Sequence, residues 1–163
     1  AFSTDVSITK GTVKGNVYGG GQIGRVEDDA KVVIGEENAN EGTTPTIMGS
    51  VFGAGAGLAT HGYSALVRGN AGVTVQGVAQ VGGSVYGGSA LGAVNASTTK
   101  DATTGNITAY TPTSNATTTV TLKKGTVSQS VFGGGMGRIP TNSTSNDGVQ
   151  AQVYGKGIVN FYG

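Results

Sequence analysis

The chain has 163 residues and a formal net charge of +1, and 31 of its residues are glycine. The absence of cysteine excludes disulfides and thiolate metal sites, and the near-neutral charge gives no electrostatic footprint for nucleic acid. Three prolines and no Gly-X-Y period exclude collagen, and no apolar run approaches the ~20 residues of a membrane span.

The composition predicts an all-β chain. Valine outnumbers leucine by 20 to 4. β-Branched residues lose side-chain freedom in helices and fit a pleated, half-buried surface. Each glycine disfavours a helix by about 1 kcal/mol relative to alanine, and no window shows helical apolar spacing without a glycine interrupting it.

Along the chain, the first predicted elements are strands with apolar residues at every second position. The pattern begins with Val6 and Ile8 and returns with Val73 and Val75. A period of two is typical of a strand buried on one face. The pieces that carry it are 5–15, 71–83 and 119–129, with a weaker copy at 30–36.

A second pattern recurs after most of these strands: a small polar residue, valine, an aromatic residue and glycines. We call each copy of this pattern an anchor. It reads NVYGGG from 16, SVFGAG from 50, SVYGGS from 84 and SVFGGG from 130, and NFYG from 160 resembles a truncated copy. Repeats with loops of variable length predict a parallel, right-handed β-solenoid, in which equivalent residues stack at the ~4.8 Å strand spacing. The expected ladders are Val17, Val51, Val85, Val131 and Phe161 for the first column, and Tyr18, Phe52, Tyr86, Phe132 and Tyr162 for the rings.

The glycines of this pattern are predicted to be structural. The run 19–24 matches the G-x-G-x-x-G dinucleotide fingerprint, but a strand-like piece follows it instead of a helix, and the later copies break the spacing. We expect these glycines to form corners that need positive φ or a close backbone approach. The expected corners are Gly19, Gly20, Gly21, Gly53, Gly55, Gly87, Gly88, Gly133, Gly134 and Gly135.

A Thr- and Asn-rich insertion at 95–119 has little to bury and predicts either an excursion from a regular coil or a partly disordered segment. The whole chain, 1–163, is then a single domain of about four and a half repeats. The sequence leaves glycosylation open at its four N-x-S/T sequons. These are Asn95, Asn106, Asn115 and Asn142.

Catalytic, metal and cofactor chemistry has little support in the sequence. Six of the nine acidic residues lie within 27–41, which could hold a cation but is more typical of a solvated loop. The only histidine, His61, is in a loop without a partner nucleophile. A polysaccharide-active enzyme would need three or more acids on one face; the acidic pair of 28–29, beside Arg25 and Lys31, is the one candidate. We expect no enzyme activity, no metal and no cofactor.

The repeated pieces resemble the glycine-rich "VYGGG" repeat regions of large bacterial surface and secreted proteins, the β-solenoid stalks of adhesins and autotransporter passengers found in gut Bacteroidota. The resemblance implies an extracellular or cell-surface setting and a structural or adhesive role, with no catalytic residues to carry over. Such proteins are usually much longer than this chain. The resemblance covers 5–24, 30–35, 47–57, 71–92, 119–138 and 151–163.

The leading functional hypothesis is a structural filament or stalk. Its partner would be a further copy stacked head to tail, or adjoining repeats of a longer chain. If NFYG is an anchor, the path from Phe161 to Val17 of the next copy is 19 residues, the length of one coil without loops. The open strand edges at both ends of a solenoid favour such stacking.

The alternative is an adhesin segment that binds glycan or a host surface through its loops. Tyr63 and Tyr110, which lie outside the ladders, would be the contacts of that site. The loops concerned are 22–48, 55–70, 93–118 and 139–149.

Overall fold

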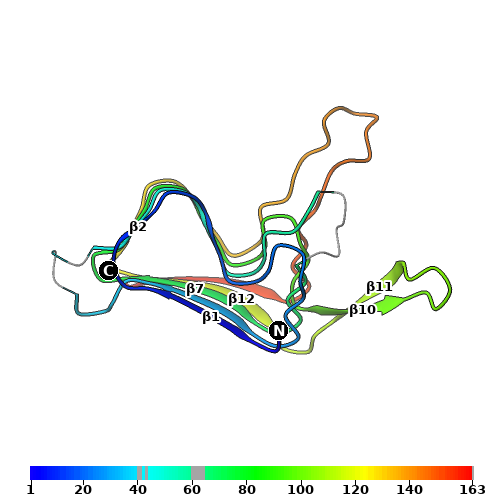
Figure 1. Ribbon diagram of the computed structural model, residues 1–163, viewed down its shortest axis with the longest axis horizontal. Coiled ribbons are helices and arrows are strands. Elements are labelled where there is room, and N and C mark those ends of the chain that lie inside the picture. Colours follow the sequence, from blue (N-terminus) through cyan, green and yellow to red (C-terminus); the bar gives the residue numbers. More distant parts are fainter. Residues whose placement is uncertain (40–41, 43, 60–64, 163) are drawn as a thin grey trace.

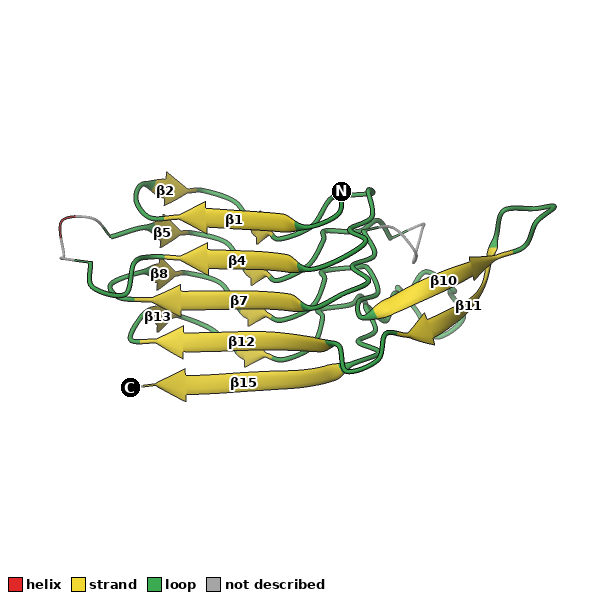
Figure 2. Cartoon of the chain, turned by 90° about the horizontal axis from the view of Figure 1, so that it is seen from below, coloured by secondary structure: helices red, strands yellow, loops and turns green. Residues whose placement is uncertain are grey.

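A computed structural model describes residues 1–39, 42, 44–59 and 65–162, and these residues form an all-β fold of strands and loops. A parallel sheet of five strands, the first sheet, has the order β1-β4-β7-β12-β15 (Figure 2). Its strands are β1 (Thr4–Ile8), β4 (Ala30–Ile34), β7 (Ala71–Gln76), β12 (Thr117–Lys123) and β15 (Lys156–Tyr162).

Two further parallel sheets contain four two-residue strands each, and their strands follow the same order along the chain as those of the first sheet. The second sheet contains β2 (Thr12–Val13), β5 (Thr46–Ile47), β8 (Gln80–Val81) and β13 (Thr126–Val127). The third contains β3 (Val17–Tyr18), β6 (Val51–Phe52), β9 (Val85–Tyr86) and β14 (Val131–Phe132). The chain therefore visits the three sheets in turn four times and ends in the first sheet. We call each visit to the three sheets a pass, and the passes superpose in Figure 1.

A fourth side of each pass is marked by single valines. Val26, Val67, Val94 and Val153 form a row of isolated parallel bridges. Together with the alanines that begin β4 and β7, these valines form a small core of their own. The main core lies between the three sheets and buries the alternating residues of the first sheet, such as Val32, against the valines of the second and third. The alternation predicted in the sequence is thus matched by burial, most regularly in β7 and β12.

The predicted insertion is an ordered antiparallel hairpin, β10 (Ala96–Lys100) with β11 (Ile107–Pro112), which projects from the stack in Figures 1 and 2. The two strands pair their backbone groups with each other, as an excursion from a regular coil can. Residues 117–119, at the end of the predicted insertion, belong to β12, and Thr118 is fully buried there.

The assignment of Phe161 and Tyr162 to the ladders was wrong. Both lie in β15, where Phe161 pairs with Leu122 and Tyr162 with Lys123 of β12. NFYG is therefore the end of a first-sheet strand and not a truncated anchor, so the 19-residue junction calculated from it does not hold. The seven backbone pairs of β15 with β12 fix this register, and a short sequence similarity does not outweigh them.

The prediction of positive φ at the corner glycines was also wrong, because none of the ten expected glycines has a positive φ. Those that do include Gly35 and Gly77, which follow first-sheet strands. Gly19 and Gly53 are required for close approach between passes: a Cβ on Gly19 would lie 2.2 Å from the Gly53 oxygen, and one on Gly53 would lie 2.4 Å from the Gly87 oxygen.

Candidate functional site

The aromatic residues of the repeated pattern form a continuous stack of rings. The centroids of Tyr18 and Phe52 are 5.0 Å apart, those of Phe52 and Tyr86 4.8 Å, and those of Tyr86 and Phe132 4.9 Å. The rings lie within 15° of parallel, because the strand pairing places each above the last. Phe52 is 1% exposed and Phe132 44%, so the stack is closed in its middle and open at the end formed by β14.

The small polar residue before the valine of each anchor forms a second column beside the ring stack. The sequence showed that this residue recurs, but the sequence analysis did not predict its role. The side-chain oxygen of Asn16 accepts the Ser50 backbone N–H at 2.8 Å, and Ser50 Oγ accepts that of Ser84 at 3.1 Å. Ser84 Oγ in turn accepts the Ser130 N–H at 3.3 Å. Each side chain therefore satisfies a backbone donor of the next pass, which explains why a small acceptor recurs at this position.

The described acidic residues of the segment 27–41 do not come together as a cation site. Glu27 pairs with Arg25 at 3.2 Å near the start of β4, and Glu37 pairs with Lys123 at 3.6 Å beyond its other end. Asp29 accepts hydrogen bonds from the backbone and side chain of Asn70. Within the described ranges, no three His, Cys, Asp or Glu side chains gather as a metal site would require.

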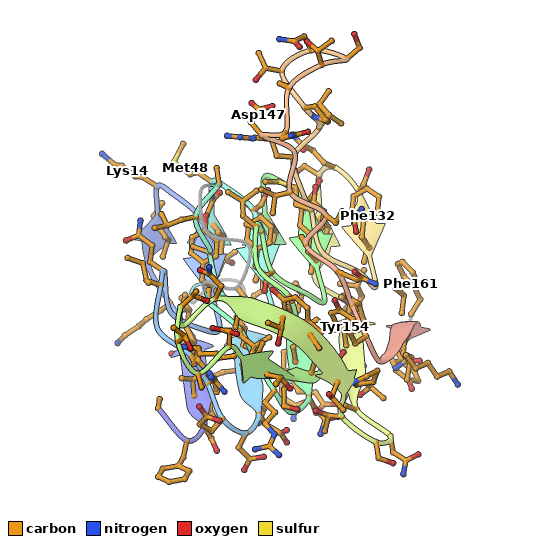
Figure 3. All side chains as sticks on the ribbon, turned by 90° about the vertical axis from the view of Figure 1, so that its right-hand side faces the viewer. Lys14, Met48, Phe132, Asp147, Tyr154 and Phe161 are labelled. Atoms are coloured by element: carbon orange, nitrogen blue, oxygen red, sulfur yellow. The ribbon has the colours of Figure 1, made fainter. Side chains whose placement is uncertain are left out.

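A cleft of about 350 Å³ lies between the hairpin and the last loops of the chain. Tyr110, on β11, stacks on Tyr154 with ring centroids 5.2 Å apart, and Figure 3 shows Tyr154 beside the hairpin. Burial raises the pKa of Tyr154 above its usual value. The sequence analysis selected Tyr110 and missed Tyr154. The cleft is lined by Ala59, Ala93, Tyr110, Asn146, Gly148, Val149, Gln150, Ala151, Gln152 and Tyr154.

The loop between Arg138 and Val149 projects from the stack and is held at its base by Asp147 (Figures 1 and 3). The Asp147 carboxylate accepts hydrogen bonds from Ser145 Oγ and from the hydroxyl and N–H of Thr141, and it pairs with Arg138 at 3.3 Å. These contacts lower the pKa of Asp147 far below its usual value, the Ser145 bond contributing most. The carboxylate hydrogen bonds are therefore kept as the pH falls through the ordinary range of an aspartate, and are lost only at the lowered pKa.

Asn95 is a structural residue at the root of the hairpin. It is fully buried with φ 60°, and its side-chain amide donates to the backbone oxygens of Gly69 and Thr117 at 2.6 and 3.2 Å. A side chain buried in this way is not accessible to modification in the folded chain. Asn106 and Asn142 are exposed, and Asn115 also lies at the surface.

The remaining predicted residues fall outside the described ranges or into the sheets. Glu41, His61 and Tyr63 lie among the residues that the structure does not describe. The segment 22–48, expected to be a loop, contains β4 and β5. Of the loops expected to contact a glycan, 93–118 supplies the hairpin and 139–149 supplies one wall of the cleft.

Comparison with known proteins adds no identification. No family model, curated protein or solved structure matches the chain. Across the described residues, no helix is long and apolar enough to span a membrane. The functional argument therefore depends on the columns, the open ends and the cleft described above.

Proposed function

We propose that this chain is a non-catalytic structural segment of an extracellular bacterial filament or stalk, built as a right-handed β-solenoid. The observation that supports this most strongly is the shared order of the three sheets, in which each pass lies directly on the previous one. Backbone ladders, stacked rings and a polar column all run in the same direction, from β1 to β15.

The chemistry of the chain supports a load-bearing role. Its recurring features all make contacts between passes: valines in the core, rings in the stack and glycines where neighbouring backbones come close. The two ends of the stack present strand edges, and unpaired edges are templates for another strand. The extracellular setting follows from the resemblance to surface stalks.

Electron microscopy of the purified protein at neutral pH tests this function. We expect unbranched filaments whose axial repeat is a whole multiple of the ~4.8 Å strand spacing. Phe132→Asp should abolish them by placing a charge at the open end of the ring stack, while Ile139→Asp, at a position 86% exposed in the projecting loop, should leave them intact. Discrete particles for the unchanged protein at every concentration would refute the filament.

A second candidate function, glycan binding by an adhesin segment, is favoured by the cleft beside Tyr110 and Tyr154. Aromatic faces and side-chain amides such as Gln150 and Gln152 are groups that can contact a sugar ring and its hydroxyls. On a glycan array, we expect Tyr154→Ala to lose any signal and Tyr162→Ala, at an exposed tyrosine in β15, to keep it. An array without signal for the unchanged protein would remove this candidate.

A further inference from the structure

The two ends of the stack are not flat. The first sheet has five strands and the other two have four, so β15 extends one strand beyond β13 and β14 (Figure 2). Phe161 is 68% exposed and Phe132 44%, and Figure 3 shows both at this end. A groove of about 540 Å³ lies there, between β15 and the uncovered strands β13 and β14. We call it the terminal groove. It is lined by Leu122, Lys124, Gly125, Thr126, Val127, Gln129, Val131, Phe161 and Tyr162.

The third sheet leaves matching hydrogen-bond groups at its two ends. Within the molecule, Val17 N–H donates to the Ser50 oxygen and Gly19 N–H to the Phe52 oxygen, each at 2.9 Å, and the same pattern repeats to β14. The equivalent donors on β14 are the N–H groups of Val131 and Gly133. The equivalent acceptors on β3 are the oxygens of residues 16 and 18. None of these four groups has a partner within the described part of the chain.

The second sheet also leaves matching groups at its two ends, but its hydrogen bonds point in the opposite direction along the stack. Its N–H groups donate back to the preceding pass, as in Thr126 N–H to the Ala79 oxygen at 2.8 Å. The N–H of Thr12 on β2 and the oxygen of Gly125 beside β13 are the equivalent groups left at the two ends. A second copy placed with β2 and β3 on β13 and β14 would therefore continue both ladders, with Tyr18 stacked on Phe132.

The first sheet obstructs this placement, because β15 already occupies the position that β1 of the second copy would take. If β1 paired on β15 instead, the second and third sheets would each have a gap of one strand. The register shows how the conflict is resolved: the inward residues Val6 and Ile8 of β1 occupy the positions that Val159 and Phe161 occupy in β15.

We propose that copies of this chain join by strand exchange, with β15 of one copy replacing β1 of the next. In the joint, β15 lies between its own β12 and β4 of the second copy, and β13 and β14 pair with β2 and β3 of that copy. The exposed Phe161 and Val159 then enter the core of the second copy. This inference rests on the proposed filament and specifies its joint.

Disulfide trapping in this 163-residue chain distinguishes the two joints, since the chain has no cysteine. Ser7, Val33 and Asn160 share one register position on β1, β4 and β15. Exchange places Asn160 beside Val33 of the next copy, whereas simple edge pairing places it beside Ser7. Neighbouring strands, ~4.8 Å apart, are within reach of a disulfide. Within one copy, β4 and β15 are separated by two strands, so no internal bond can form.

We expect the variant with Val33→Cys and Asn160→Cys to form a ladder of covalent oligomers under oxidation, and the variant with Ser7→Cys and Asn160→Cys to form at most traces. The filament repeat should be four passes, about 19 Å, since each joint shares one first-sheet position; edge pairing gives five passes, about 24 Å. A ladder from the Ser7 variant, or filaments without a ladder from the Val33 variant, would overturn the exchange and leave the filament standing. Absence of filaments would instead remove the proposed function, and the exchange with it.

Discussion

Replacing Phe52 by aspartate is expected to unfold the protein. Phe52 is fully buried, with Tyr18 stacked on one face and Tyr86 on the other. Removing a buried phenylalanine side chain costs about 3–5 kcal/mol, and an unpaired buried carboxylate adds a further desolvation penalty. Since the whole stability of a small domain is about 5–15 kcal/mol, we expect loss of the cooperative thermal transition followed by circular dichroism.

The same substitution at Phe132 is the matched control. Phe132 has the same neighbours in sequence but stacks on one side only and is 44% exposed. A charge there can remain in water, so the Phe132→Asp protein should keep its transition with a modest loss in midpoint. Equal losses for the two variants would show that the ring stack is not graded from centre to end as described.

Gly53→Ala is the second substitution with a large expected effect. The added Cβ would lie 2.4 Å from the Gly87 oxygen and 3.1 Å from the Gly72 nitrogen, and both are backbone atoms that cannot swing away. Overpacking of this kind costs about 1–3 kcal/mol, occasionally more. Because the contact joins two neighbouring passes, the strain falls on both. Urea denaturation should show a lower midpoint with an unchanged slope.

Gly134→Ala is the control for this backbone argument. Gly134 belongs to the same glycine-rich pattern, does not have positive φ, and would have no atom within 4 Å of its Cβ. An alanine there restricts the unfolded chain and should be neutral or stabilising by up to about 1 kcal/mol. If Gly53→Ala proved as harmless as Gly134→Ala, close approach could not be the reason for the glycines.

The sequence predicted those parts of the fold in which one residue type determines one contact. Alternating apolar residues predicted β1, β4, β7 and β12 of the first sheet, because period two matches the pleat. The recurring Val-aromatic pair marked β3, β6, β9 and β14, since the rings stack only if every pass places an aromatic residue at the same register position.

Other features could not be predicted because they depend on partners distant in the sequence. The row of Val26, Val67, Val94 and Val153 consists of single bridges with no local periodicity. The position of β15 follows from its pairing with β12 and not from its resemblance to an anchor. Tyr154 becomes a cleft residue only because the hairpin brings Tyr110 onto it.

The hairpin leaves and rejoins the stack at two residues that are hydrogen-bonded to each other, so its outer part can vary in sequence. Asn95 fixes the point where the chain leaves the stack, and its backbone oxygen accepts the N–H of Thr113 at 2.8 Å where the chain returns. From one pass to the next, equivalent first-sheet residues are separated by 26 to 47 residues, yet the columns keep their spacing. New sequence can therefore be inserted in the exposed turn between β10 and β11 without disturbing the stack, so the tip of the hairpin can vary while the structure that supports it is kept.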